Sequence, residues 1–456
     1  MDLSAFFSPR TMAVVGVSSS NFQHPANVVF AKNRHRYPVE VFPVSPRGGT
    51  LQGQEVFERV GDIPGRIDLA VIAVKADAVP DVLVDCAAAG VGGAAVISGG
   101  FTEVGRQDLQ DRLAAIAREA SMPLIGPNCL GIYVPSRVDT FFLPSERMVK
   151  PRRGNVTFVS QSGGILVDVM IRFAQEGVGL ARAVSIGNKA VLGEADLLPF
   201  LVEDPETRVI AFYIEGFGRD EGRRFVRAAR QCGKPVVVLK SGRSPEGSRA
   251  VSSHTASLAG DYASFSAALA QYGLLEASTK SELVSFCEVL SAYPRPAVMG
   301  NVAIITASGG HGAMAMDACA SYGIPVPTLS GPAQEKIRAA LSERVAGIAS
   351  LGNPVDLTGS AVDDDFAACA DALFALGEVD CVVALLLPYI PGITSDLGSK
   401  MSTVASRHGK PLVAYVPQVD KYDMLIEGFE LNGVPVSPSI EGAVEMVRAL
   451  KGNRPC

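Results

Sequence analysis

Short apolar runs alternate with longer helical stretches along the first third of the chain. The runs that suit strands are TMAVVGVS, VEVFPVSP, DLAVIAVK, GAAVISGG and MPLIGPNC. Between the third and fourth runs, the apolar residues of 76–92 recur at spacings of three and four, which predicts a crossover helix. Strand, helix and strand in this order predict a parallel sheet. The pattern fails over 136–154, where prolines and charges collect, so we place a first domain at 1–150.

The rest of the chain contains an internal duplication. The paired segments are GNVTFVSQSGG at 154–164 with GNVAIITASGG at 300–310, SIGN at 185–188 with SLGN at 350–353, and GKPVVVLKSG at 233–242 with GKPLVAYVPQ at 409–418. Three matches in the same order predict two similar doubly wound domains, at 153–292 and 300–456. The predicted fold class is therefore α/β, with three such domains in series and ligand-binding turns at the carboxyl ends of their strands.

Composition excludes several classes of function. Of the 456 residues, 48% are hydrophobic and 19% are charged, which is typical of a folded globular protein. The formal net charge of -6 disfavours a nucleic-acid partner, because phosphate backbones are bound by clustered Lys and Arg. No apolar run is long enough to span a membrane and no signal peptide is recognisable, so we expect a cytoplasmic protein. The eight cysteines are scattered without a CxxC pair, so neither a disulfide framework nor a metal site is expected.

The turn after the first apolar run is a candidate anion site. Gly16 is followed by small polar residues, and such a turn ahead of a helix directs backbone N–H groups at an anion. These residues are Ser18, Ser19, Ser20 and Asn21. An ordinary strand-to-helix turn is the alternative. The dinucleotide fingerprint GxGxxG is missing, and PVSPRGG stands where a ribose-binding acid is expected, which disfavours NAD. Arg47 in that segment suits a phosphate, so the turn predicts a phosphorylated nucleotide carrier as ligand.

Two glycine-rich turns, at 160–164 and 308–312, each follow an apolar run and begin a helical stretch. Neither has the P-loop pattern GxxxxGK[ST], so neither is expected to bind ATP in that way. Their backbone N–H groups could hold one phosphoryl group, although a turn required only for tight packing is the alternative for each.

His254 is the candidate nucleophile. It lies in RAVSSHTASLAGD, whose small polar residues leave the imidazole approachable, although a solvated loop histidine is the alternative. A neutral imidazole can attack phosphorus and pass the group onward, and it needs a carboxylate on its other ring nitrogen to fix its tautomer. Glu215, at the end of the run VIAFYI, is placed to be that partner, with a strand-end helix cap as the alternative. The remaining histidines are His24, His35 and His408, expected on the surface, and His311, which stays ambiguous.

Seven motifs, spread over nearly the whole chain, occur together. In chain order they are ISGGFTE, GPNCLG, SQSGG, SIGNKA, YIEG, SSHTASLAG and NPVDLTG. With these motifs the chain resembles the α part of the nucleoside-diphosphate-forming acyl-CoA synthetases, the relatives of succinyl-CoA synthetase. The resemblance implies a Rossmann-like CoA-binding domain followed by two flavodoxin-like domains. It also implies a reversible reaction that joins a small carboxylic acid to CoA and converts ATP to ADP, through an acyl phosphate and a phosphohistidine.

The resemblance also implies roles for individual residues. His254 would be the phosphorylated histidine, and Glu215 the carboxylate that orients it. The residues that would contact CoA are Gly16, Ser18, Ser19, Ser20, Asn21, Arg47, Ile97, Ser98 and Gly99. Those that would hold phosphate through their N–H groups are Ser162, Gly163 and Gly164.

The ATP-grasp part that members of this family carry has no counterpart in this sequence, which ends at KGNRPC after the third predicted domain. The resemblance therefore implies a separate ATP-grasp β subunit that binds ATP or ADP with Mg2+, and hence a hetero-oligomer. A non-catalytic scaffold or sensor that binds CoA or acyl-CoA is the alternative.

Three positions depart from the family pattern. Ala256 stands where Gly usually follows His-Thr, Val191 where Asp usually follows SIGNKA, and His311 where Pro usually precedes the last Gly of the turn. These changes are compatible with phosphohistidine chemistry, and they leave the acid substrate unidentified.

Overall fold

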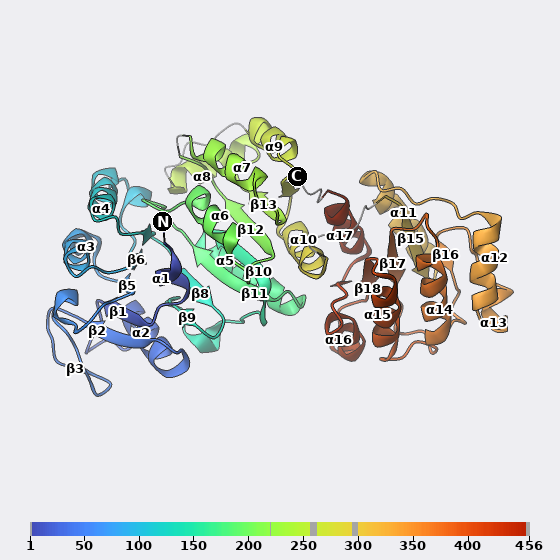
Figure 1. The fold of residues 1–456 in the computed structure, drawn as a ribbon, viewed down its shortest axis with the longest axis horizontal. Coiled ribbons are helices and arrows are strands. Elements are labelled where there is room, and N and C mark those ends of the chain that lie inside the picture. Colours follow the sequence, from blue (N-terminus) through green and yellow to red (C-terminus); the bar gives the residue numbers. More distant parts are fainter. Residues whose placement is uncertain (1, 219, 256–261, 294–299, 453–456) are drawn as a thin grey trace. The chain divides into compact units, whose positions relative to one another are not determined.

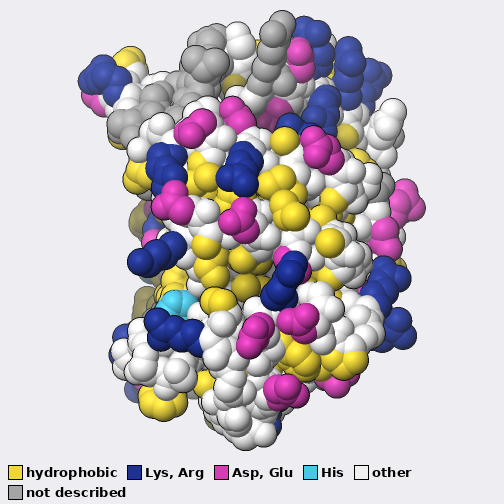
Figure 2. All heavy atoms as spheres, turned by 90° about the vertical axis from the view of Figure 1, so that its left-hand side faces the viewer, with side chains coloured by type: hydrophobic (Ala, Val, Ile, Leu, Met, Phe, Trp, Pro, Cys, Tyr) yellow, Lys and Arg dark blue, Asp and Glu magenta, His cyan; other side chains and the backbone are white. Residues whose placement is uncertain are grey.

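The computed structural model describes residues 2–218, 220–255, 262–293 and 300–452, apart from the side chains of 252–255 (Figure 1). The chain divides into two compact units after residue 278. On the face drawn in Figure 2, acidic and basic side chains are interspersed around apolar surface. In the part of the chain that is described, no helix has the length and apolar character needed to cross a bilayer.

A five-stranded parallel sheet forms the amino-terminal part of the first unit, in the order β2-β1-β5-β6-β7. Its strands are β1 (Thr11–Val15), β2 (Glu40–Val44), β5 (Leu69–Ile72), β6 (Gly93–Val96) and β7 (Leu124–Ile125). Around it lie α1 (Ser4–Phe7), α2 (Pro25–Arg36), α3 (Val79–Ala88), α4 (Gln107–Glu119) and a short hairpin of β3 (Thr50–Leu51) and β4 (Gln54–Glu55). The strands are almost continuously apolar because helices cover both faces of the sheet. The five predicted strands and the predicted crossover helix, α3, are confirmed.

A seven-stranded sheet completes the first unit, in the order β14-β13-β12-β10-β11-β8-β9. Its strands are β8 (Gly131–Val134), β9 (Val138–Asp139), β10 (Arg153–Ser160), β11 (Leu180–Ser185), β12 (Val209–Ile214), β13 (Val236–Lys240) and β14 (Leu275–Ala277). Its helices are α5 (Gly163–Gln175), α6 (Glu194–Glu203), α7 (Glu221–Arg230), α8 (Pro245–Thr255) and α9 (Tyr262–Gln271).

One edge of this second sheet is built by β8 and β9, which directly follow the last strand of the first sheet. β8 pairs antiparallel with β11, and β9 pairs antiparallel with β8. Ile132, Val134 and Val138 from this edge lie in one hydrophobic cluster with Val159 of β10 and Val14 of β1. The two sheets of the first unit therefore share a continuous core, which the chain crosses between β7 and β10.

The second unit holds a five-stranded parallel sheet in the order β16-β15-β17-β18-β19. Its strands are β15 (Val302–Thr306), β16 (Val355–Asp356), β17 (Cys381–Leu385), β18 (Leu412–Tyr415) and β19 (Val436–Ser437). Its helices are α10 (Lys280–Ala292), α11 (Gly309–Ser321), α12 (Gly331–Ala340), α13 (Glu343–Ala346), α14 (Asp363–Phe374), α15 (Leu397–His408), α16 (Asp423–Glu430) and α17 (Ile440–Gly452).

The order of the parallel strands is the same in β10–β14 and in β15–β19. In both sheets the first strand lies between the second and the third, which is the flavodoxin-like order 2-1-3-4-5. The duplication inferred from the sequence is therefore repeated in the topology.

The compact units do not coincide with the three predicted domain ranges. β8 and β9 lie within the range 1–150 but extend the sheet of the next range. Helix α10 lies within the range 153–292 but belongs to the second unit, where the Glu288 side chain accepts the N–H of Val436 at 2.7 Å. The boundaries 1–150, 153–292 and 300–456 therefore stay a prediction.

Candidate functional site

The turn after β1 lies directly against the end of β5. Gly16 has a φ of +103°, and a Cβ on it would lie 2.4 Å from the carbonyl O of Ala73, so glycine alone fits. Its N–H donates to the carbonyl O of Val44, at the end of β2, at 2.9 Å. Three strand ends thus meet where the strand order reverses, which is the usual ligand position in sheets of this type.

The polar residues of this turn form an exposed loop ahead of α2. The Asn27 side chain brackets Ser18: its Oδ1 accepts the Ser18 N–H at 2.8 Å, and its Nδ2 donates to the Ser18 carbonyl O at 2.7 Å. The Ser18 hydroxyl accepts the N–H of Asn21 at 3.1 Å. Ser19, Ser20 and Asn21 are exposed. The loop therefore presents polar groups at a helix N-terminus, which favours a phosphate.

The other residues predicted to contact CoA lie at the same edge of the first sheet. Arg47 is exposed in the loop after β2, and Ile97, Ser98 and Gly99 follow β6. The Ser98 hydroxyl donates to the carbonyl O of Val74 at 2.6 Å, which ties the ends of β5 and β6 together. The exposed Lys75, which ends the apolar run of β5, adds a positive charge at the same edge.

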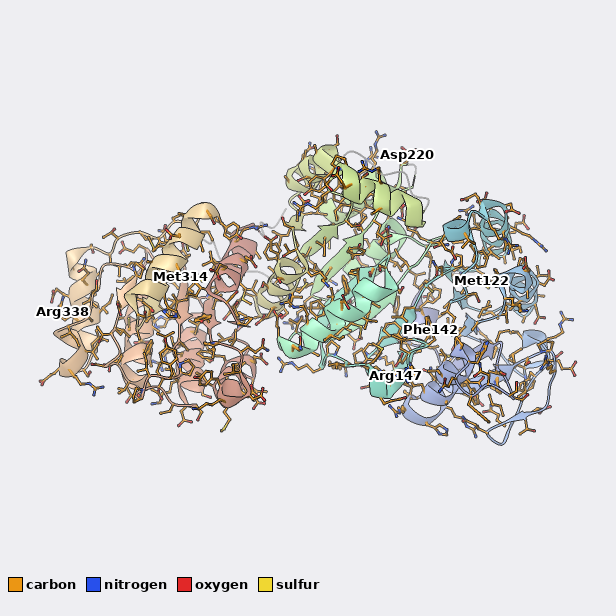
Figure 3. The ribbon with its side chains drawn as sticks, turned by 180° about the vertical axis from the view of Figure 1, so that it is seen from behind. Met122, Phe142, Arg147, Asp220, Met314 and Arg338 are labelled. Atoms are coloured by element: carbon orange, nitrogen blue, oxygen red, sulfur yellow. The ribbon has the colours of Figure 1, made fainter. Side chains whose placement is uncertain are left out.

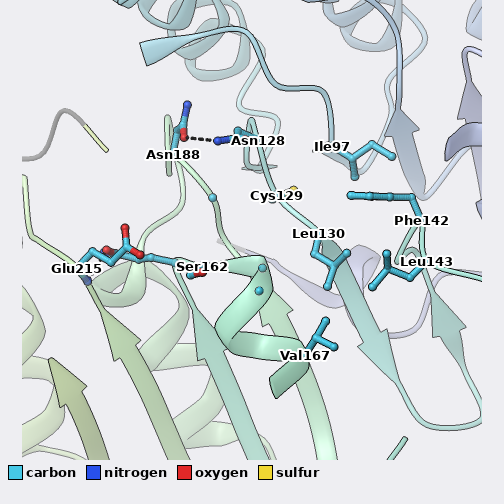
Figure 4. Close-up of a pocket in the computed structure, with 14 residues that line it drawn as sticks. Ile97, Asn128, Cys129, Leu130, Phe142, Leu143, Ser162, Val167, Asn188 and Glu215 are labelled. Carbon is cyan, nitrogen blue, oxygen red and sulfur yellow. Dashed lines mark hydrogen bonds between the residues drawn. The ribbon is translucent and has the colours of Figure 1, made fainter. Parts of the chain in front are cut away.

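A pocket of about 390 Å³ opens between the two sheets of the first unit (Figure 4). Its polar lining residues are Asn128, Gln161, Ser162, Asn188 and Glu215. Its apolar lining residues are Ile97, Cys129, Leu130, Phe142, Leu143 and Val167. Three glycines, Gly163, Gly164 and Gly187, complete the described lining. The pocket brings one predicted CoA residue, Ile97, together with the predicted phosphate turn and with Glu215.

The phosphate turn is the N-terminus of α5. Ser162 is the N-cap residue, and its hydroxyl accepts the N–H of Ile165 at 3.3 Å. Gly163 and Gly164 are the first two helical residues, whose N–H groups have no acceptor within the helix. Their position at the positive end of the helix makes this wall of the pocket suited to a phosphoryl group.

Gln161 connects the phosphate turn to the strand end that carries Glu215. Its Oε1 accepts the N–H groups of Glu215 and Gly216, at 2.6 and 3.1 Å, and its Nε2 donates to the Gly216 carbonyl O at 2.8 Å. Gln161 and Glu215 are both buried, at 9% and 8% exposure. These hydrogen bonds determine where the Glu215 carboxylate enters the pocket.

Behind Gln161 lies a buried charge cluster, in which one ammonium group stands between two carboxylates. Lys189 Nζ is 2.9 Å from Glu194 Oε2 and 2.8 Å from Glu221 Oε2, and Gln161 Nε2 donates to Glu194 Oε1. Burial raises the pKa of Glu194 to about 7, Lys189 lowers it in part, and Glu221 raises it. Burial alone would lower the pKa of Lys189, but the two carboxylates raise it above its usual value.

Lys240 is a second buried cation beside Glu215. Its Nζ donates to the carbonyl O of Glu215 at 2.7 Å and to that of Ser241. Burial lowers the pKa of Lys240, and the Glu215 carboxylate offsets part of that effect. Gln161, Lys189 and Lys240 were all missed at the sequence level. Lys240 had a signal, because a lysine at the end of the buried run VVVLK needs a specific partner.

The SIGNKA segment faces the first sheet through Asn188. Its Nδ2 donates to Glu103 Oε2 at 2.6 Å, and its Oδ1 accepts from Asn128 Nδ2 at 3.3 Å. The neighbouring Gly187 has a φ of +55°, and a Cβ there would lie 2.3 Å from the carbonyl O of Pro127. This close approach seats the loop after β11 against the end of the first sheet.

His254 falls in helix α8, and its side chain lies outside the described residues. Ala256 lies outside them as well. The proposed pairing of His254 with Glu215 therefore stays a prediction. Val191 is partly buried and packs against the hydrophobic clusters of the first unit, which the polar Asp usual in the family would not do.

The second glycine-rich turn begins α11 in the second unit. His311 Nδ1 lies 3.1 Å from the hydroxyl of Ser308, and its ring is 6.2 Å from that of Tyr415. A strand, a small polar turn and a helix that begins with two glycines therefore follow one another here as they do at β10 and α5.

Comparisons with known proteins identify the family of this chain. The CoA binding domain matches residues 10–135, and the succinyl-CoA ligase like flavodoxin domain matches residues 153–290. The alpha subunit of acetate–CoA ligase (ADP-forming) II of Pyrococcus furiosus is 34% identical over 98% of this chain and 97% of its own length. The chain belongs to the family of ADP-forming acyl-CoA ligases.

Two further comparisons concern a longer relative and a solved structure. The ADP-forming acetate–CoA ligase I of Archaeoglobus fulgidus is 36% identical over 85% of this chain, which spans 55% of that longer protein. A solved structure of acetyl-coenzyme A synthetase 1 of Ca. Korarchaeum cryptofilum, in complex with phosphate and ADP, has a TM-score of 0.90 and 30% identity. The structural match covers 99% of this chain and 97% of the chain in the solved structure. As a member of this family the chain matches the alpha subunit, which confirms the resemblance, the fold class and the acid–thiol ligase assignment. The comparisons favour the ligase over a non-catalytic scaffold.

Proposed function

We propose that the chain is the α subunit of a heteromeric ligase that joins a small carboxylic acid to CoA and converts ATP to ADP and phosphate. A separate ATP-grasp β subunit would hold ATP or ADP with Mg2+. The observation that carries the proposal is the pocket that combines the end of β6, at Ile97, with the phosphate turn of α5 and with Glu215. A thiol delivered from the CoA side and a phosphoryl group on the helix N-terminus would meet there.

The proposed reaction has three balanced steps. An imidazole nitrogen of His254 attacks the γ-phosphorus of ATP, so that an N–P bond forms, the P–O bond to ADP breaks and ADP leaves. A carboxylate oxygen of the acid then attacks that phosphorus, the N–P bond breaks and an acyl phosphate forms. Finally the CoA thiolate attacks the acyl carbon, a thioester forms, and phosphate leaves. Each step is reversible.

The residues of this chain would support these steps in different ways. Glu215 would accept a hydrogen bond from the second ring nitrogen of His254, which keeps the attacking nitrogen unprotonated and stabilises the charge that develops. The N–H groups of Gly163 and Gly164 would hold the phosphoryl oxygens as charge develops on them. The turn at Gly16 and the side chain of Arg47 would bind the nucleotide phosphates of CoA.

The reverse reaction tests the proposal without the partner. We expect the full chain, incubated with radiolabelled phosphate and a mixture of acyl-CoA thioesters, to acquire acid-labile label and to release free CoA thiol. Label should disappear in His254→Ala and form at least tenfold more slowly in Glu215→Gln, because the developing imidazolium loses its carboxylate. His35→Ala, at an exposed histidine of α2 that does not line the pocket, is the matched control. Label that persists in His254→Ala would contradict the proposal.

The forward reaction tests the need for a partner. We expect the isolated chain to bind CoA but not to form ADP from ATP, acid and CoA at a steady rate, and addition of an ATP-grasp β subunit should restore turnover. Steady ADP formation by the chain alone would contradict the requirement for a separate β subunit.

A further inference from the structure

The pocket beside α5 has two chemically different ends. Glu215 and Ser162 lie at the end on the left of Figure 4, whereas apolar side chains gather at the opposite end. These side chains are Ile97, Leu130, Phe142, Leu143 and Val167. They come from the end of β6, the approach to β8, the segment after β9 and the second turn of α5. The chemistry proposed above uses the polar end and, at Ile97, the side from which CoA would enter, but it gives no role to Leu130, Phe142, Leu143 or Val167.

The apolar end is held in place by a buried lysine. Lys32 of α2 donates to the carbonyl O of Phe141 and to that of Leu143, the latter at 3.1 Å, and it forms an ion pair with Asp139 at 2.9 Å. The side chains of Lys32 and Asp139 are only 5% and 0% exposed. The backbone on both sides of Phe142 is therefore fixed (Figure 3), and its ring lies next to Ile97 at the apolar end of the pocket (Figure 4). A wall that is organised before the ligand arrives is typical of a specificity determinant.

The charges of the lining restrict what the apolar end can accept. Among the described residues that line the pocket, none is Lys, Arg or His, and Glu215 contributes a carboxylate. At the apolar end, a second carboxylate of the ligand would lose its hydration among Ile97, Leu130, Phe142, Leu143 and Val167, at a large cost in free energy. An acetyl methyl group would leave much of the apolar surface in contact with water, whereas a longer or branched alkyl chain would cover it.

We infer that the acid substrate is a monocarboxylic acid with an apolar chain of several carbons, which lies against Phe142, Leu143 and Val167 while its carboxyl group meets the phosphate turn. This inference rests on the proposed ligase function. It adds the substrate class, which the sequence could not supply.

Thioether analogues of CoA test this inference, because they place an alkyl group in the pocket and cannot react. We expect the full chain to bind S-butyl-CoA at least tenfold more tightly than CoA in a calorimetric titration, because each buried methylene contributes roughly fourfold. S-(2-carboxyethyl)-CoA should bind no more tightly than CoA. Phe142→Ala and Leu143→Ala should each reduce the gain from the butyl group severalfold and leave the affinity for CoA itself unchanged.

The control and the contrary outcomes separate the two proposals. Leu431→Ala, at a side chain that is 74% exposed in the second unit, should leave all three affinities unchanged. If CoA binds but the carboxyethyl analogue binds as tightly as the butyl analogue, or if the butyl gain survives in both wall variants, the substrate class is wrong and the ligase proposal stands. If CoA itself does not bind, the ligase proposal fails and the inference fails with it.

Discussion

The side-chain Oε1 of Gln161 accepts the backbone N–H of Glu215 at 2.6 Å. The same amide group holds both backbone polar groups of Gly216. The strand end that delivers the Glu215 carboxylate to the pocket is thus fixed by the residue immediately before the phosphate turn. In the proposed mechanism Gln161 would be a positioning residue, because small displacements of a charged group at a reacting centre reduce rates strongly.

Gln161→Leu should therefore impair phosphorylation more than it impairs CoA binding. The N–H groups of Glu215 and Gly216 would be left buried without an acceptor, which should lower the free energy of unfolding by about 2–4 kcal/mol. We expect the rate at which His254 acquires label to fall at least tenfold in protein that is still folded, with the affinity for CoA unchanged. Gln107→Leu on the exposed face of α4 is the matched control. Wild-type labelling in folded Gln161→Leu would show that Gln161 has only a structural role.

Gly16→Ala should disrupt the predicted CoA turn. The added Cβ would lie 2.4 Å from the carbonyl O of Ala73, and the φ of +103° is unfavourable for alanine. We expect at least a tenfold loss of CoA affinity and a loss of about 2–3 kcal/mol of stability. CoA titration and denaturant unfolding measure the two effects.

Gly53→Ala separates local strain from the loss of the ligand site. Gly53 also has a positive φ, of +78°, but no atom lies within 4 Å of the Cβ that the variant would add. Its expected cost is about 1 kcal/mol, with CoA affinity retained. An equal loss of CoA affinity in both variants would indicate that the turn at Gly16 does not bind the ligand.

Glu194 should make stability depend on pH near neutrality. Its pKa in the folded protein, about 7, lies above the ordinary value of 4.5, so the folded chain holds a proton that the unfolded chain has lost. The associated stabilisation is complete below pH 4.5 and is lost as the pH rises through 7. Glu194→Gln, which cannot ionise, should lack this dependence.

The measurement is the free energy of unfolding of both proteins from pH 5 to 8. The wild type should lose up to about 3 kcal/mol relative to Glu194→Gln over this range. The free energy of unfolding of Glu58→Gln, a change at an exposed glutamate, should depend on pH in the same way as that of the wild type. If the free energies of unfolding of the wild type and Glu194→Gln differ by the same amount at every pH, the raised pKa of Glu194 is wrong.

The ion pair behind the apolar wall should respond asymmetrically to the loss of either partner. Asp139 also pairs with Lys150 at 2.5 Å, so it keeps a cation in Lys32→Met, whereas Asp139→Asn leaves two lysines without their common counter-ion. We expect Asp139→Asn to cost about 3–5 kcal/mol of stability and Lys32→Met clearly less. Denaturant unfolding checks the order. Equal costs would show that Lys150 does not compensate.

Much of the fold could be read from local patterns. The apolar runs around Val14, Val71 and Ala95 are buried strands, and Gly16 lies in a turn that excludes a side chain, as its place after a strand suggested. The duplication could be recognised because the same strand and glycine turn recur after 146 residues, at 154–164 and 300–310. In the structure both segments form the first strand of their sheet, and a helix follows each. Strand period and turn chemistry act over a few residues, so the sequence displays them directly.

The candidate site was only partly legible. Glu215 and the turn from Ser162 to Gly164 were named from their motifs, and the structure brings them into one pocket. Gln161, Lys189 and Lys240 were missed, because a buried polar side chain has meaning only through the partner that satisfies it. The carbonyl O of Gly216, for example, accepts a hydrogen bond from Lys189, 27 residues earlier in the chain, and one from Gln161, 55 residues earlier.

By itself, then, the sequence determined the parallel strands, their repeated topology, the glycine turns and the family. Only the tertiary structure decided that β8 and β9 join the second sheet, that Lys32 fixes the backbone around Phe142, and that apolar side chains from four segments line one pocket with the phosphate turn. The physical reason is range: hydrophobic period and backbone conformation are local properties, whereas a pocket and a buried ion pair exist only after distant segments have packed together.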